Sequence, residues 1–157
     1  MEFLAWLETT AIANAIRTVP WLYPAIETVH YIGLSFLVGG IMLIDLRVLG
    51  LARSLPLKSM IGLLPFVWAG FIINVVTGSL LFIYGATNFG PNTAFQIKMG
   101  FMLLAGLNAL AFDLTVRRSG GEWVASDRPP TLAKSLATLS LVFWLCVVTT
   151  GRWMAYL

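Results

Sequence analysis

Charged residues are scarce in this 157-residue chain. Asp, Glu, Lys and Arg make up 11% of it, whereas a soluble domain carries roughly 25%. Hydrophobic residues make up 59%, which is more apolar surface than a soluble domain of this length is able to bury but which a lipid bilayer accommodates. The composition therefore excludes an ordinary soluble protein and indicates an integral membrane protein.

Cysteine and histidine are rarer still, with one of each, Cys146 and His30. One cysteine excludes an intrachain disulfide and a Cys/His metal knuckle. The sequence also lacks a phosphate-binding loop and a nucleophile triad, so no catalytic residue is assigned. Its cations are dispersed, which argues for no nucleic-acid binding. The first residues lack the basic segment and cleavage site of a secretory signal, so we expect insertion through the spans themselves.

Long apolar runs are what the sequence has in abundance. A membrane-spanning helix needs about 20 mostly apolar residues, and four segments meet this length, at about residues 24–49, 58–84, 93–116 and 131–157. Pro65 is expected to kink the second of them. We therefore expect a single all-α membrane domain over residues 1–157, built as a four-helix bundle in the lipid bilayer.

Residues 2–18 are too short and too mixed in polarity to cross a bilayer. Helical spacing places one stripe of residues on a common face, formed by Phe3, Leu4, Leu7, Ala11 and Asn14. Glu8 lies beside this stripe. The segment is therefore predicted to be a short N-terminal interfacial helix that lies on the membrane surface.

The cations are distributed unequally between the two ends of the predicted spans. Seven of the ten flank the loops after the first and third spans: Arg47, Arg53, Lys58, Arg117, Arg118, Arg128 and Lys134. The other three, Arg17, Lys98 and Arg152, lie toward the opposite ends. The positive-inside rule then predicts that a multi-pass protein has both termini on the outer side of the membrane and both polar loops in the cytoplasm.

Weak internal similarity links the two halves of the chain. Asp45-Leu-Arg-Val48 matches Asp113-Leu-Thr-Val116, and Lys58-Ser59 matches Lys134-Ser135. Either the matches are chance similarities between apolar helices, or they reflect two hairpins that are parallel repeats about an axis normal to the membrane. In the register of the repeat, Lys98 would lie opposite His30.

Ionisable side chains gather at the outer depth of the predicted bundle. Tyr23, Glu27 and His30 share one face of the first span, and exposing the last two to lipid would be costly. Three cations lie in the same depth band, so the candidate cofactor-binding residues are Tyr23, Glu27, His30, Arg17, Lys98 and Arg152. The excess of positive charge suits haem propionates, a small anion or a lipid headgroup. In the alternative, Lys98 and Arg152 only extend to headgroups.

His30 itself has three interpretations. It ligates a metal or haem iron, with Glu27 as the second metal-ligand candidate; it relays protons beside Glu27; or it is a hydrogen-bonded structural histidine. Glu27-x-x-His30 is half of the paired motif of di-iron bundles, whose second copy the chain lacks. A two-fold dimer would supply a second His30.

Polar residues at the predicted membrane centre have a structural and a functional interpretation. Asn74, Thr77 and Asn108 either form interhelical hydrogen bonds or line a polar path for a solute. Small residues that permit close helix approach are Gly39, Gly40, Gly78 and Gly106. Asp45 with Arg47, and Asp113 with Arg117, are expected to anchor the inner boundary, and the second pair has the i, i+4 spacing of a helix-surface ion pair.

Short motifs follow one another along nearly the whole chain: Trp21-Leu-Tyr-Pro24, Glu27-x-x-His30, Gly33, Asp45-Leu-Arg47-x-Leu-Gly50, Thr77-Gly78, Asn92-x-x-Phe95-x-x-Lys98, Asn108 and Gly151-Arg152. In these motifs the chain resembles an uncharacterised family of small bacterial inner-membrane proteins, which implies a four-span membrane domain. More loosely, it is similar to copper-resistance D and cytochrome b561-type bundles, which hold haem between paired histidines on different helices. This chain departs from that pattern by having His30 alone.

Three hypotheses of function follow. The first is an outer-leaflet site at which His30 and Glu27 bind haem b or a transition metal as a redox cofactor, shared between subunits or completed by a methionine or Lys98. The second is a homo-oligomeric channel or transporter for a small anion or a proton-coupled solute. The third is an accessory subunit of a membrane complex. A homo-oligomer, with a dimer as its simplest form, is expected in the first two.

Overall fold

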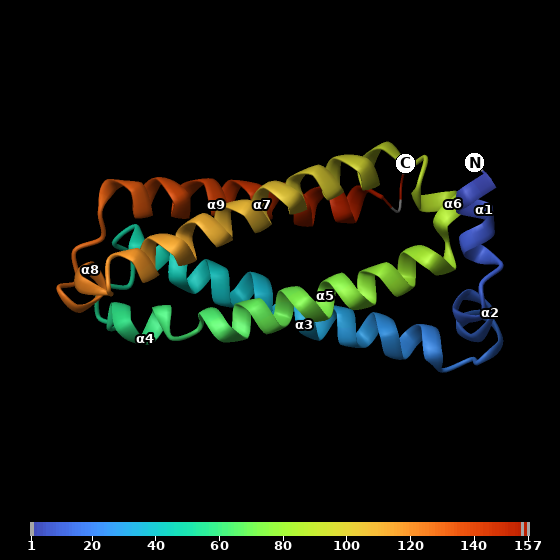
Figure 1. The fold of residues 1–157 in the computed structure, drawn as a ribbon, viewed down its shortest axis with the longest axis horizontal. Helices are drawn as coiled ribbons and strands as arrows, with labels where there is room; N and C mark the ends of the chain where they lie inside the picture. The colour runs from blue at the N-terminus through green and yellow to red at the C-terminus, as the bar shows by residue number, and fades with distance from the viewer. Residues whose placement is uncertain (1, 155, 157) are drawn as a thin grey trace.

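The computed structural model describes residues 2–154 and 156, which form helices joined by short loops (Figure 1). In chain order the helices are α1 (Glu2–Glu8), α2 (Ala11–Thr18), α3 (Leu22–Val48), α4 (Leu57–Ile61), α5 (Leu64–Tyr84), α6 (Ala86–Phe89), α7 (Thr93–Arg118), α8 (Glu122–Ala125) and α9 (Thr131–Trp153). The described part of the chain contains no strand. The predicted all-α class is therefore confirmed.

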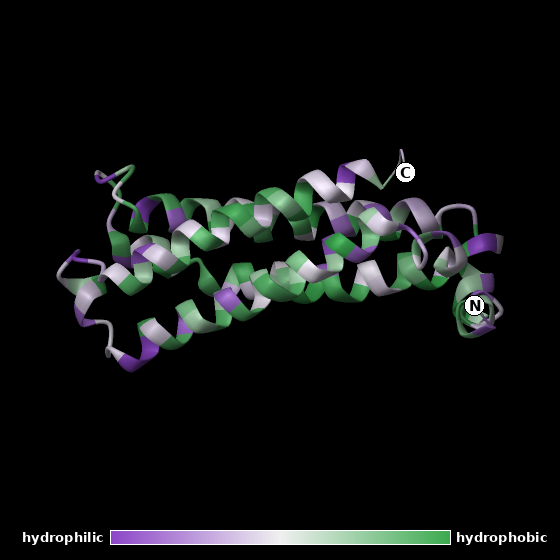
Figure 2. Ribbon diagram, turned by 90° about the horizontal axis from the view of Figure 1, so that it is seen from above, coloured by the Kyte–Doolittle hydropathy of each residue, from purple (hydrophilic) through white to green (hydrophobic). Residues whose placement is uncertain are grey.

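Four helical segments are long and apolar enough to cross a membrane. They are Leu22–Val48, Leu57–Tyr84, Thr93–Arg118 and Thr131–Trp153. Their middles are mostly apolar, and hydrophilic residues gather toward both ends of the bundle (Figure 2). The four predicted spans are confirmed within a few residues at each boundary, and the chain is a multi-pass membrane protein.

The long helices pair as two hairpins. α3 packs on α5 and α7 packs on α9, while contacts between α3 and α9 join the hairpins. Helices α1, α2 and α6 lie at one end of the bundle and α4 and α8 at the other (Figure 1). We call these the outer and inner ends, after the orientation that the cations predict. This is the hairpin arrangement that the internal similarity predicts.

Glycines let α3 and α5 approach until their backbones touch. A Cβ atom placed on Gly70 would lie 2.8 Å from the carbonyl oxygen of Gly33 and 2.8 Å from the backbone nitrogen of Leu37. A Cβ on Gly33 would lie 2.6 Å from the Ile73 side chain. Of the glycines that the sequence pointed to, Gly39 has no atom within 4 Å of its Cβ position. The close crossing therefore depends on Gly33 and Gly70.

The N-terminal segment is two helices, so the single interfacial helix predicted for residues 2–18 is wrong. Two adjacent threonines cause the break: Thr9 Oγ1 and Thr10 Oγ1 donate to the carbonyls of Trp6 and Leu7, each at 2.7 Å. Thr10 then caps α2, its side chain accepting from the amide of Ala13, as N-cap threonines do. The predicted stripe is interrupted with the helix, and α2 instead buries Ala13 and Ile16.

The second span is interrupted before Pro65 rather than kinked at it. The turn at Gly62 and Leu63 separates α4 from α5, and Pro65 lies in the first turn of α5. Proline is well tolerated there, because the first amides of a helix have no intrahelical acceptor.

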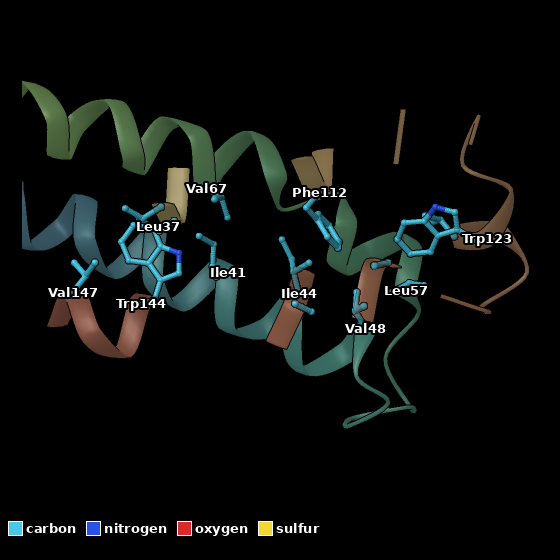
Figure 3. Packing of buried hydrophobic residues seen from close by; sticks show 14 residues of the cluster. Leu37, Ile41, Ile44, Val48, Leu57, Val67, Phe112, Trp123, Trp144 and Val147 are labelled. Atoms are coloured by element: carbon cyan, nitrogen blue, oxygen red, sulfur yellow. The ribbon is translucent and has the colours of Figure 1, made fainter. Parts of the chain in front are cut away.

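The hydrophobic core runs from the middle of the bundle, at Leu37 and Val147, to the inner end, at Leu57 and Trp123 (Figure 3). Leu37, Ile41, Ile44 and Val48 follow one face of α3 and meet Val67, Phe112 and Trp144 from the other three long helices. Large apolar side chains on the opposite helix faces are exposed, such as Phe36, Ile72, Leu103 and Leu145. These faces suit contact with lipid tails. Polar candidates of the outer half therefore lie beyond the packed core.

Candidate functional site

His30 lies where the two helices of the first hairpin face each other in the outer half. Its Nδ1 is 2.8 Å from the hydroxyl oxygen of Thr77 on α5. The imidazole is half-buried and lies against Gly78, whose Cβ position is 3.5 Å from the His30 Cε1 atom. A larger side chain at position 78 would crowd the ring. The sequence singled out all three residues but placed Thr77 at the membrane centre rather than beside His30.

The bonding of Thr77 favours one tautomer of the imidazole. The Thr77 hydroxyl donates to the carbonyl oxygen of Ile73 at 2.7 Å. With its hydrogen on that carbonyl, Thr77 is an acceptor toward His30, and the tautomer that fits this arrangement carries its hydrogen on Nδ1. In the neutral ring, Nε2 then keeps a free lone pair. Metal-ligating histidines are commonly oriented in this way, through a hydrogen bond from the other ring nitrogen.

Lys98 lies near the outer end of the second hairpin. It projects from the first turns of α7, and its Nζ lies 3.6 Å from the Cβ position of Gly151 on α9. The position opposite His30 that the repeat register gives Lys98 stays a prediction. Glycines 78 and 151 leave room beside both side chains.

Tyr23 and Glu27 lie on the same helix as His30, nearer the outer end. The ring of Tyr23 packs on that of Tyr84 with centroids 5.0 Å apart, which ties the start of α3 to the end of α5. Glu27 is half-buried and makes no hydrogen bond or ion pair with any described residue. It therefore remains free to interact with a ligand.

Arg17 joins a different group of residues. Its guanidinium donates to the carboxylate of Glu8 at 3.0 Å and to the carbonyl of Tyr84 at 2.9 Å. Glu8 Oε1 in turn accepts from the amide and hydroxyl of Thr87, at 2.8 and 2.6 Å. These bonds attach α1 and α2 to the end of α5 and to α6. The structure therefore gives Arg17 a bracing position rather than one beside His30.

This attachment is expected to depend on pH. Hydrogen bonds from the side chain and amide of Thr87, with help from Arg17, hold the pKa of the Glu8 carboxyl below its ordinary value. A carboxyl with a lowered pKa stabilises the folded arrangement above its ordinary pKa and loses that contribution as the pH falls through the lowered pKa. Acidification below the ordinary pKa of a glutamate should therefore weaken the attachment of α1 to α6.

Spin labels at Ala5→Cys and Asn88→Cys, in a Cys146→Ser background, measure this separation. The label-to-label distance distribution should be narrow at neutral pH and broaden on acidification. Glu8→Gln should be broad at every pH, whereas Glu2→Gln should behave as the parent. A parent distribution that stays narrow at acid pH, or a narrow one in Glu8→Gln, would contradict the prediction.

Arg152 also lies apart from His30. It is exposed, and its guanidinium donates to the Tyr156 hydroxyl at 2.9 Å and lies over that ring at 5.2 Å from its centroid. Within the described part of the chain, Arg17 and Arg152 therefore each bind partners other than His30. The convergence of all three was expected from depth alone, and depth carries no information about which way a side chain points.

The two asparagines of the suggested polar path are bonded to backbone. Asn74 Nδ2 donates to the carbonyl of Gly70 on its own helix at 2.9 Å. Asn108 Nδ2 donates to the carbonyl of Leu136 across the second hairpin at 3.0 Å. Such bonds favour the structural interpretation, because each amide is already held by a fixed acceptor.

The inner boundary contains one pair that was expected and one that was not. Arg117 Nε lies 2.9 Å from Asp113 Oδ2, which confirms the i, i+4 pair. Arg47 does not pair with Asp45 but binds both oxygens of Asp127 at 2.7 Å, and Arg47 Nε donates to the carbonyl of Leu55. Asp45 turns into the bundle and is 4% exposed.

The candidate ligands of a metal ion do not cluster. Among residues 2–154 and 156, no three His, Cys, Asp or Glu side chains come together as metal ligands. Any metal at His30 would therefore need most of its ligands from a cofactor or from another subunit.

A family model matches residues 3–157, nearly the whole chain. The chain belongs to DUF6644, a family of unknown function. No match was found among curated proteins or among solved structures. Membership in DUF6644 agrees with the resemblance of the sequence to an uncharacterised membrane family.

Two features of this DUF6644 protein could not be seen in the sequence. The first is the direct bond between His30 and Thr77, whose residues are 47 positions apart. The second is the inward orientation of Asp45, which was taken for a boundary anchor because Arg47 and the loop follow it so closely. A signal for the first existed, since both residues were singled out as polar groups in apolar helices.

Proposed function

We propose that the outer half of the bundle binds haem b, which His30 would hold through Nε2. One observation carries the proposal. Thr77 accepts from His30 Nδ1 because its own hydrogen is committed to Ile73, and this leaves Nε2 as the ligating nitrogen. The haem would supply one-electron redox chemistry, which makes the protein a membrane redox component.

Haem fits the available side chains better than a bare metal ion does. The described residues offer no set of three clustered ligands, whereas a porphyrin supplies four nitrogens of its own. A haem iron is commonly held by one or two protein ligands, with histidine the most frequent. A lone histidine therefore suffices for haem but not for a protein-only metal centre.

Lys98 gives the site a charge that suits haem. Its ammonium would neutralise a propionate, while Glu27, which pairs with no described residue, stays available nearer the outer end of the bundle. A homodimer would supply a second His30 and so a bis-histidine site, as in the copper-resistance D and cytochrome b561-type bundles that the sequence resembles. We also infer that this protein lies in the bacterial inner membrane, as expected for the family that its sequence resembles.

The uneven cations support the proposed orientation, with both termini on the periplasmic side. Seven of the ten Lys and Arg residues flank the inner-end loops, and cytoplasmic loops carry such an excess. The site at His30 would then open toward the periplasm. Thiol labelling of Ala5→Cys from the periplasm, but not of Ser126→Cys, would agree with this orientation, and the reverse labelling would contradict it.

The absorbance spectrum of the purified protein tests the haem proposal. Protein produced with sufficient haem should show a Soret band and give a pyridine haemochrome of haem b. His30→Gln should lose the band almost completely while eluting as a monodisperse species. Thr77→Val should bind haem at least tenfold more weakly, because loss of a hydrogen bond that orients a metal ligand costs about 10–100-fold in affinity. Asn74→Ala serves as the matched control and should keep the band.

The ratio of bound haem to protein chains distinguishes a site shared across a dimer from a site within one subunit. One haem for every two chains indicates a site shared across a dimer, and one haem for every chain indicates a site within the subunit. A protein that stays colourless after incubation with haem, or a band unchanged in His30→Gln, overturns the proposal. Solute flux in proteoliposomes that depends on His30, or stable co-purification with other membrane subunits, would then support the transport or accessory-subunit hypothesis.

A further inference from the structure

A small cavity lies in the inner half of the bundle, away from His30. Its volume is about 30 Å³, and all four long helices contribute to its walls. Most of the lining is apolar, with Ile41 of α3 and Phe112 of α7 among the contributors. Three polar side chains also reach it, Asp45 from α3, Asn108 from α7 and Ser140 from α9. The cavity therefore differs from the purely apolar gaps that stay dry.

Two buried polar atoms at this cavity have no hydrogen-bond partner. One is the acceptor Oδ2 of Asp45, a residue that is 4% exposed. The other is the donor Nε1–H of Trp144, which is 3% exposed and also lines the cavity. The Trp144 nitrogen lies on the side of the ring that faces Ile41 (Figure 3). Leaving such groups unpaired is costly, so the cavity is built for a polar occupant.

The environment of Asp45 determines what this occupant is. Ser140 lines the same cavity, and no cation among the described residues pairs with Asp45: Arg47 binds Asp127 and Arg117 binds Asp113. Asp45 is the one titratable residue among the described residues that line the cavity from α3, α5, α7 or α9. A buried carboxylate without a counter-charge is strongly disfavoured, so the neutral acid is the form that suits this position.

The indole donor excludes a bare cation as the occupant beside it. Trp144 Nε1–H is a donor only and directs its positive end into the cavity. Water suits both orphan atoms, because it can accept from Trp144 and can either accept from the protonated Asp45 or donate to the ionised form. The volume of about 30 Å³ holds roughly two waters.

We propose that this cavity is a hydrated proton-binding site, at which Asp45 takes up and releases a proton through water held by Trp144. Water that accepts and donates lets the carboxyl change its protonation state without leaving a buried group unsatisfied. The site lies one helical turn before the end of α3 at Val48, close to the inner surface from which a proton would enter. It is separate from the haem proposal and does not rest on it.

Indole resonances in ¹⁵N-tryptophan-labelled protein test the proposal in detergent micelles. The Trp144 Nε1–H resonance should shift as the pH is varied, and this titration should be lost in Asp45→Asn. Trp123 is the internal control, because its Nε1 is also buried and unpartnered but does not line the cavity. Its resonance should stay constant. Trp144→Phe and Trp123→Phe assign the two signals.

Infrared difference spectra between acid and alkaline pH give a second readout. The wild type should show a carboxylic-acid C=O band that shifts in D₂O, is absent in Asp45→Asn and persists in Asp113→Asn. If Asp45→Asn does not fold, Ser140→Ala should still shift the band, because it removes a hydroxyl that lines the same cavity as the carboxyl. A wild type with no such band and a pH-independent Trp144 resonance would overturn the proposal, as would a band that persists in folded Asp45→Asn.

The titration of Trp144 and the carboxylic-acid band are also expected in His30→Gln. Failure of this proposal is therefore distinguishable from failure of the haem site.

Discussion

Replacing Gly70 by alanine is expected to lower the free energy of unfolding by about 1–3 kcal/mol, the usual range for overpacking. The added methyl would lie 2.8 Å from the carbonyl oxygen of Gly33 and from the backbone nitrogen of Leu37. These are backbone atoms of a helix and cannot move aside as a flexible side chain would. The two helices must therefore separate, although alanine by itself favours helix formation by about 1 kcal/mol.

Gly39→Ala is the matched control on the same helix pair. No atom lies within 4 Å of its Cβ position, so only the helix preference remains and this variant should be equally or more stable. Unfolding in mixed micelles measures both. Equal stabilities of Gly70→Ala and Gly39→Ala would show that the backbones are not in contact. Because α3 and α5 also present His30 and Thr77 to each other, Gly70→Ala should weaken any ligand bound at His30.

Removing the carboxylate of Asp127 is expected to destabilise the inner end by about 1–3 kcal/mol, the cost of leaving a buried polar group without its partner. The side chain of Arg47 is 4% exposed, whereas that of Asp127 is 53% exposed. In Asp127→Ala the guanidinium keeps the Leu55 carbonyl but loses both bonds to the carboxylate. In Arg47→Met the carboxylate is instead hydrated by solvent, so the two losses are unequal.

A double-mutant cycle measures this inequality. Asp127→Ala should cost more than Arg47→Met, and it should cost almost nothing when Arg47 is already methionine. Both residues line a polar pocket of about 400 Å³ together with Arg53, Arg128 and Lys134. Lys134→Met is the control, since it removes a charge from the same pocket without touching the pair. Additive effects of the two substitutions would indicate that the ion pair contributes no coupling energy.

Much of the fold could be predicted from the sequence, because the bilayer makes length and hydropathy decisive. Each span of about 20 apolar residues must be helical, since only a helix satisfies its own backbone groups in lipid. Local rules also held where one helix contained both partners, as for Asp113 and Arg117. The N-terminal segment was predicted less well, since two side-chain hydroxyls at Thr9 and Thr10 end one helix there and begin the next.

The candidate site could be predicted only as a set of residues. His30, Thr77 and Lys98 stood out because polar groups are rare in apolar helices. Their partners did not follow, and Arg17 and Arg152 were grouped with them by depth alone. The hydrogen bond to Thr77, which determines the free nitrogen of His30, spans 47 positions, and the bond of Arg47 to Asp127 spans 80.

The sequence by itself therefore determined which segments cross the membrane and how they follow one another. It also determined which polar residues lie in apolar spans, where they cost free energy unless they are paired or functional. The tertiary structure alone decided which way those residues point. In the structure the side chain of Asp45 points into a cavity that Trp144 also lines. The side chain of Arg47 binds Asp127 in a loop, and that of His30 contacts Thr77. The physical reason is that lipid tails are as apolar as the bundle interior, so the hydropathy of a spanning helix does not distinguish its lipid-facing side from its buried side.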